Sequence, residues 1–199
     1  MFADDKIKDF LEAVAAKRPT PGGGSVSAIV GALGAALGVM TARYSEDADS
    51  EGALDVLKND FAALSDADAE AYGLVTSAMS LPKDSEETKR RRKTALQAAF
   101  ADAAEVPLKG MGLAAKGLEV LAALAGRCNK HLVSDLASAC GFLWAALEGC
   151  AENVRVNAAS LHDADKRLRL ESERARLLAS GAERRNGILK AVEAAYAAK

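Results

Sequence analysis

PTPGGGSVSAIVGALGAALGVMTA, residues 19–42, is the stretch that decides how this chain folds. Two prolines prevent a helix from running through its first part, and three consecutive glycines let the backbone turn sharply there. Ser25 is a favoured N-cap residue, so we expect a helix to begin at Ser25 and to run to about Tyr44. Each interior glycine costs about 1 kcal/mol relative to alanine, which indicates that other backbones pack very close. We therefore expect a central helix with neighbours all round.

The loop 19–24 combines free backbone N–H groups with the positive end of the helix that follows, an arrangement that binds carboxylates and other anions. A flexible turn followed by a helix of small, packed residues is an equally open interpretation. A dinucleotide fingerprint would need a preceding strand and a P-loop would need a following GK[ST], and the sequence shows neither. The apolar run of about 17 residues also approaches the length of a membrane span. Polar residues such as Ser27, Thr41 and Arg43 interrupt it, which favours a buried helix and no membrane partner.

The composition is typical of an all-α protein. Half of the 199 residues are hydrophobic but only 5% are aromatic, and alanine and leucine dominate. We expect an all-α, single-domain helical bundle over residues 1–199, with the Gly/Ala-rich helix at its centre. The net charge of −2 gives no reason to expect a nucleic acid or an anionic membrane as a partner.

The cysteines and histidines do not form a metal-binding pattern. Cys128, Cys140 and Cys150 lack CxxC spacing, and His131 and His162 lie far apart in the sequence. We expect no metal site and no catalytic histidine. Three thiols suit a reducing cytoplasm, and the charged N-terminus does not resemble a signal peptide.

Hydrophobic periodicity predicts further helices along the chain. Pro107 is expected to kink or break one of them near residues 105–106, Ser134 or Asp135 to cap another, and Gly181 is a point where the last could be interrupted. An acidic loop is expected at 45–50. The helices are expected at about residues 3–16, 51–81, 85–124, from 134 or 135 to beyond 157, and 164–198.

Asp68 is the most informative single residue, because it lies within an otherwise apolar helical face. At 100° per residue, seven apolar side chains fall within a stripe about 80° wide, with Asp68 in its middle. A carboxylate there must be paired, hydrogen-bonded or protonated, and desolvation would raise its pKa towards the range useful for acid–base catalysis. A purely structural buried aspartate is the alternative. The stripe consists of Leu54, Leu57, Phe61, Leu64, Tyr72, Val75 and Met79.

The run EETKRRRK, residues 86–93, looks like a basic patch. Glu86 and Glu87 stand four residues before Arg90 and Arg91, which is the spacing of ion pairs on a helix surface. No aromatic residues are interleaved, so we interpret the run as a solvated helix face and expect no nucleic acid partner. Lys83 could reach an anionic substrate tail.

Six segments together resemble the cyclodeaminase/cyclohydrolase family, which comprises the C-terminal domain of formiminotransferase-cyclodeaminase and stand-alone bacterial relatives. The similarity runs from about residue 10 to residue 170, and PTPGGGS followed by a Gly/Ala helix is the most specific part. The segments are PTPGGGSVSA, SDADAEAY, LPK with the EE-rich helix start, EVPL, NKHLVSDL and ENVRVN.

The resemblance implies a homodimeric helical subunit, a tetrahydrofolate substrate, no metal and no permanently bound cofactor. It also implies a formiminotransferase as a candidate partner. The second aspartate of the family's DAD segment matches Asp68, which the resemblance makes the catalytic residue. The candidate substrate-binding residues are Gly22, Gly23, Gly24, Ser25, Ser134, Asp135, Asn153 and Asn157.

Three functions remain open. The first is cyclodeamination of 5-formiminotetrahydrofolate to 5,10-methenyltetrahydrofolate with release of ammonia, and the second is hydrolysis of 5,10-methenyltetrahydrofolate to 10-formyltetrahydrofolate. The third is a non-catalytic helical dimer that binds folate or scaffolds another protein. Many relatives carry a lysine-rich stretch where this chain has the acidic segment 45–50, so a polyglutamate tail would have to bind elsewhere or weakly.

Overall fold

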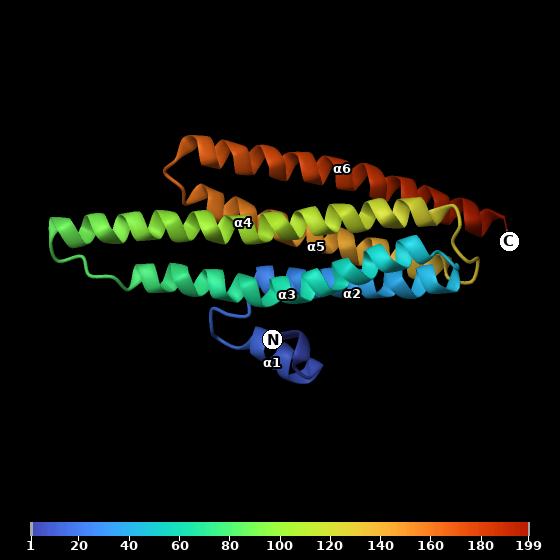
Figure 1. The fold of residues 1–199 in the computed structure, drawn as a ribbon, viewed down its shortest axis with the longest axis horizontal. Helices are drawn as coiled ribbons and strands as arrows, with labels where there is room; N and C mark the ends of the chain where they lie inside the picture. Colours follow the sequence, from blue (N-terminus) through green and yellow to red (C-terminus); the bar gives the residue numbers. More distant parts are fainter. Residues whose placement is uncertain (1, 199) are drawn as a thin grey trace.

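A computed structural model describes residues 2–198, and within this range it contains helices and no β-strand. A short 3₁₀ helix at the N-terminus precedes six α-helices (Figure 1). The elements are the 3₁₀ helix Phe2–Asp4, α1 Ile7–Ala15, α2 Gly23–Tyr44, α3 Ala48–Met79, α4 Glu86–Ala125, α5 Val133–Ala159 and α6 Ala164–Ala197. The expectation of an all-α helical bundle is confirmed.

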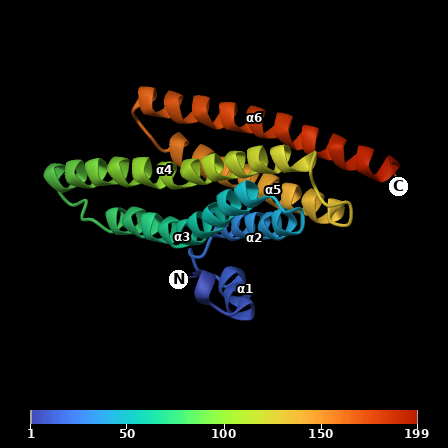
Figure 2. The ribbon, with the colours of Figure 1, turned by 45° about the vertical axis from the view of Figure 1, so that its right-hand side comes forward.

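Four of the helices form a closed ring. Helix α2 packs against α3 and α5, and α4 packs against the same two helices, whereas α2 and α4 scarcely touch across the middle. Helix α6 lies along the outer side of α4 and α5 (Figures 1 and 2). The core between these helices consists mainly of leucine and alanine, as the composition predicts.

The glycines of α2 allow this close packing. A Cβ on Gly31 would lie 2.5 Å from the ring of Phe61 in α3, and one on Gly34 would lie 3.0 Å from the backbone nitrogen of Leu143 in α5. A side chain at either position would force the neighbouring helix away, which a close-packed interior does not tolerate. The predicted close packing is therefore confirmed on two sides of the helix.

The prediction of neighbours all round α2 is wrong within the described chain. Leu33 points outwards and is 58% exposed, because the ring of helices covers α2 only where it faces α3 and α5. Among residues 2–198, α2 is the one helix long and apolar enough to span a membrane, and 56% of its most apolar window is buried. Helix α1 has no buried residue and lies outside the bundle (Figures 1 and 2).

Several predicted helix ends differ from the structure. Helix α2 begins at Gly23 with Gly22 as its N-cap, so Ser25 lies inside the first turn and does not cap it. Helix α5 begins at Val133 with Leu132 as its N-cap, which leaves Ser134 and Asp135 within the first turn as well. In both cases the chain reaches helical geometry before the polar side chain that was expected to start it. Helix α6 runs without interruption through 181.

Of the expected kink or break at Pro107, the break does not occur, because helix α4 continues through the proline. Proline has no N–H to donate to the carbonyl four residues earlier, which here belongs to Ala103. The side chain of Asn157 replaces that donor, since its Nδ2 donates a hydrogen bond of 2.9 Å to the Ala103 oxygen. Asn157 of α5 therefore supplies the hydrogen bond that Pro107 removes from α4. The same hydrogen bond holds Asn157 in the cavity that Asp68 also lines.

Candidate functional site

Asp68 lies where the middle of α3 passes the N-terminal turn of α2. The Ser25 hydroxyl donates a hydrogen bond of 2.9 Å to Asp68 Oδ2. Ser25 is itself fully buried, and its carbonyl accepts a hydrogen bond of 3.3 Å from the hydroxyl of Ser65, one turn before Asp68 in α3. Gly22, the N-cap residue, has no side chain that could accept a hydrogen bond from the first turn of α2. The Asp68 carboxylate of the neighbouring helix accepts one instead, from the backbone N–H of Ser25.

Gly24 makes room for this carboxylate. A Cβ at Gly24 would lie 2.0 Å from Asp68 Oδ1, a distance that real Cβ atoms do not reach. Gly24 is buried, and the carboxylate occupies the space that a side chain would need. The close approach of Asp68 thus requires glycine at position 24.

Burial raises the pKa of Asp68 above the ordinary aspartate value. Hydrogen bonds from the side chain and the backbone N–H of Ser25 act in the opposite direction, because both stabilise the charged form, and they only partly offset desolvation. The predicted direction of the shift is confirmed. A carboxyl group with a raised pKa can both accept and return a proton near neutral pH.

A cavity of about 190 Å³ opens beside Asp68. The loop before α2, the middle of α3 and the C-terminal half of α5 form its walls. Its lining residues are Pro19, Thr20, Gly22, Gly23, Gly24, Asp68, Tyr72, Ala103, Asn153, Val156 and Asn157.

Two asparagines of α5 face Asp68 across this cavity with their amide orientation fixed. Asn153 Nδ2 donates 2.9 Å to the carbonyl of Gly149, and Asn157 Nδ2 donates 2.9 Å to Ala103. Neither Oδ1 has a hydrogen-bond partner within residues 2–198. Because the NH₂ groups are already engaged, the site offers two amide oxygens as acceptors for donors of a bound molecule.

The structure brings together seven of the nine candidate site residues. Gly22, Gly23, Gly24, Asp68, Asn153 and Asn157 line the cavity, and Ser25 lies behind Asp68 as its hydrogen-bond donor. Ser134 and Asp135 lie elsewhere, in the first turn of α5. Eighteen residues of helix separate Asp135 from Asn153, which corresponds to about 27 Å. Within this subunit they belong to the other end of the bundle.

Tyr72 and Val156 are cavity residues that the sequence did not identify. Tyr72 and Met79 belong to the predicted apolar stripe, but the two side chains are 42% and 47% exposed. The other apolar members of the stripe are buried. The signal for Tyr72 was its position four residues after Asp68, which places both side chains on the same helix face.

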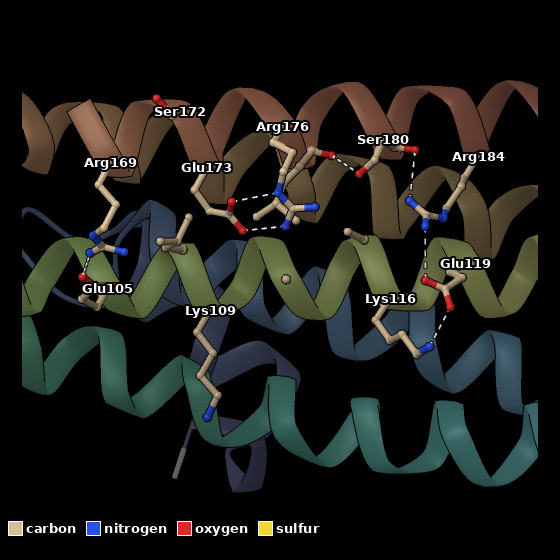
Figure 3. Close-up of a pocket in the computed structure, with 14 residues that line it drawn as sticks. Glu105, Lys109, Lys116, Glu119, Arg169, Ser172, Glu173, Arg176, Ser180 and Arg184 are labelled. Carbon is tan, nitrogen blue, oxygen red and sulfur yellow. Dashed lines mark hydrogen bonds and ion pairs between the residues drawn. The ribbon is translucent and has the colours of Figure 1, made fainter. Parts of the chain in front are cut away.

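A larger cavity of about 790 Å³ lies between α4 and α6 (Figure 3). Its charged residues pair with one another: Arg169 with Glu105, Arg176 with Glu173 at 2.6 Å, and Arg184 with Glu119 at 3.2 Å. Lys109 points away from α6 in this view. We call this cavity the α4–α6 groove. Its three carboxylates are all paired with arginines or lysines, so it lacks the unengaged acceptors of the Asp68 cavity.

No three His, Cys, Asp or Glu side chains in residues 2–198 gather closely enough to hold a metal ion. Cys140 and Cys150 are buried core residues, as predicted, and burial raises the pKa of Cys150 to about 12.

Comparison with known proteins assigns the chain to a family. The family model for formiminotransferase-cyclodeaminase matches residues 6–176. The chain belongs to this family. It is 33% identical over 183 residues to the methenyltetrahydrofolate cyclohydrolase of Methylorubrum extorquens, which covers 85% of this chain and 88% of that protein.

Two further family members show the same relationship. The formimidoyltransferase-cyclodeaminase of Mus musculus is 33% identical over 171 residues, which covers 80% of this chain but only 32% of the mouse protein. The crystal structure of formiminotetrahydrofolate cyclodeaminase from Thermotoga maritima superposes with a TM-score of 0.88 and 27% identity, covering 98% of both chains. The chain is therefore a member of the folate one-carbon cyclodeaminase/cyclohydrolase family with the fold of that cyclodeaminase.

Proposed function

We propose that the protein is a cyclodeaminase that converts 5-formiminotetrahydrofolate to 5,10-methenyltetrahydrofolate and ammonia. The observation that carries this proposal is the half-buried carboxyl group of Asp68, held by Ser25 and facing two amide acceptors in a small cavity. The names of the mouse and Thermotoga maritima relatives support the choice of reaction.

The reaction needs one group that first accepts and then returns a proton. N10 of the folate attacks the carbon of the protonated formimino group, a new C–N10 bond forms, and the Asp68 carboxylate takes the proton that N10 loses. The resulting carboxylic acid gives that proton to the amino group of the tetrahedral intermediate. The C–N bond to this group then breaks, ammonia leaves, and the methenyl bridge remains.

The surrounding residues have supporting roles in this proposal. Asn153 and Asn157 present oxygen acceptors that suit N–H donors of the substrate or of the leaving ammonia. Gly22 and Gly23 let the substrate approach the backbone at the start of α2. No permanently bound cofactor enters the mechanism, because tetrahydrofolate is itself the substrate.

Hydrolysis of 5,10-methenyltetrahydrofolate is a second candidate, favoured by the Methylorubrum extorquens relative. In that reaction the Asp68 carboxylate would take a proton from water as its oxygen attacks the methenyl carbon. It would return the proton to N5 as the C–N5 bond breaks, and the hydroxyl group of the intermediate would lose its proton to solvent, which yields 10-formyltetrahydrofolate. The two reactions use the same group at the same place.

The proposal also includes a homodimer in the cytoplasm and a formiminotransferase that supplies the substrate. A cleft of about 510 Å³ between α1 and α2, lined by exposed Ile7, Leu11 and Leu33, supports an interface with a second copy. The three free cysteines support a reducing compartment. The two activities in the name of the mouse relative support the partner.

The assay that tests the function follows the absorbance of methenyltetrahydrofolate in two reactions. One reaction contains 5-formiminotetrahydrofolate and the other contains 5,10-methenyltetrahydrofolate, each with and without the protein. Appearance of the methenyl product with ammonia in the first reaction is the expected result. Accelerated loss only in the second would identify the cyclohydrolase, and uncatalysed rates in both would favour the non-catalytic helical dimer.

A further inference from the structure

A stripe of side chains on α4 leads outwards from the Asp68 cavity. At 100° per residue, Leu96, Phe100 and Arg92 lie within about 60° of Ala103, which lines the cavity. Leu96 and Phe100 are only partly buried. Helix α2 begins at Gly23 and α5 ends at Ala159, and Figures 1 and 2 show the α3–α4 hairpin continuing beyond both.

Exposed apolar side chains border this stripe. Tyr72 and Met79 lie on the same face of α3 as Asp68, and Val156 of α5 is 63% exposed at the rim of the cavity. Exposed aromatic and apolar side chains that gather along one path are typical of a contact site. Here the path starts at the candidate catalytic carboxylate.

The path ends in positive charge. Arg92 Nε donates a hydrogen bond of 3.1 Å to the carbonyl of Met79, which fixes the guanidinium at the C-terminus of α3. Lys93 is exposed and forms no ion pair within residues 2–198, whereas Lys89 is paired with Glu86 at 2.6 Å. Lys93 lies ten residues from Ala103, about 15 Å along α4.

We propose that this path binds the p-aminobenzoylglutamate tail of the folate, with the aromatic ring along Tyr72 and the carboxylates at Arg92 and Lys93. The inference rests on the proposed function, because it assumes a folate whose reacting carbon lies at Asp68. The groups of the ligand come in the same order as the side chains of the path. In the ligand an apolar ring follows the reacting centre, and carboxylates follow the ring. Arginine held by one hydrogen bond is preorganised to bind a carboxylate with its remaining donors.

The test compares two substrates that differ only in the glutamate. KM and kcat are measured with the folate substrate and with the corresponding tetrahydropteroate, which lacks the glutamate. The variant is Arg92→Gln/Lys93→Gln. The matched control is Arg90→Gln/Arg91→Gln, which removes the same charge from the same helix but at a separate cavity lined by Arg90, Arg91 and Glu87.

The tail site predicts that the wild-type protein prefers the glutamate-bearing substrate and that the variant loses this preference. KM for that substrate should rise by roughly tenfold with kcat little changed. KM for the tetrahydropteroate should stay the same, and the control should behave like the wild type. The single variant Lys93→Gln, which keeps the Met79 contact, should show a smaller rise in KM.

Three results would contradict the tail site: an unchanged KM in the double variant, an equal loss with both substrates, or the same loss in the control. A wild-type protein that turns over neither substrate would instead refute the proposed function. The failure of the function and the failure of the tail site are therefore distinguishable.

Discussion

The Asp68 cavity and the α4–α6 groove differ in whether their polar groups have partners, and their volumes do not reveal this difference. The groove is about four times larger, 790 Å³ against 190 Å³, and carries more charged residues. Its carboxylates are matched by arginines and lysines, and those ion pairs lower the pKa of Glu119 and Glu173. In the smaller cavity burial raises the pKa of Asp68, and two amide oxygens have no partner in the described chain.

The contrast shows which feature points to chemistry. Long, exposed side chains that neutralise one another form a solvated surface and contribute little free energy. A half-buried carboxyl group with a raised pKa costs stability, and such groups cluster at functional sites. The predictions below test whether the two cavities differ as this reasoning requires.

The largest difference should appear in turnover. Asp68→Asn should lower kcat by about 10²- to 10⁴-fold, because the amide cannot accept and return a proton, while the folded structure is retained. Glu173→Gln in the α4–α6 groove is the matched control and should leave kcat unchanged. Steady-state kinetics and circular dichroism check both, and full activity of Asp68→Asn would remove the proton-transfer role.

Glycine-to-alanine substitutions compare the space at the two cavities. Gly24→Ala should lower kcat/KM by about 10²-fold, because the new Cβ displaces the Asp68 carboxylate. It should also lower the free energy of unfolding by about 1–3 kcal/mol.

Gly112 lines the α4–α6 groove, and a Cβ added there would meet no atom of a neighbouring element within 4 Å. Gly112→Ala should therefore keep full activity and gain up to about 1 kcal/mol of stability from its helix propensity. Urea denaturation and kinetics measure both variants. Equal behaviour of the two alanines would contradict the close fit at Gly24.

A double-mutant cycle tests how Asn157 is held beside Asp68. Asn157→Leu leaves the Ala103 carbonyl without a donor and should cost about 1–3 kcal/mol of stability. In a Pro107→Ala background the helix supplies its own N–H to that carbonyl, so the same substitution should cost about 1 kcal/mol less. If Asn157→Leu lowered the free energy of unfolding equally with and without Pro107→Ala, Asn157 would not compensate for the proline.

The smallest effect concerns the pH dependence of stability. The folded-state pKa of Asp68 lies above its unfolded-state value, so the unfolded chain binds fewer protons in the interval between them. Asp68 therefore costs stability as the pH rises through this interval, which starts at the ordinary aspartate value of about 4. Asp68→Asn should gain stability relative to the wild type between acidic and neutral pH. A constant difference between the two proteins in urea denaturation would contradict this.

Much of the fold and part of the site could be predicted from local patterns. The PTPGGGS turn, the Gly/Ala helix and the position of Asp68 on an apolar face depend on residues close in sequence. The continuous helix at Pro107 could not be predicted, because its missing donor comes from Asn157, fifty positions away. The same holds for Ser25, whose hydroxyl serves Asp68 of another helix instead of its own N-terminus.

The most direct test of the proposed chemistry is the pKa of Asp68, measured by ¹³C NMR titration of the side-chain carboxyl groups with Asp68→Asn to assign the signal. We predict that Asp68 titrates above the ordinary aspartate range, while Glu119 and Glu173 of the α4–α6 groove titrate below the ordinary glutamate range. An Asp68 that titrates at or below its ordinary value would contradict the claim that this cavity holds a poised proton-transfer group.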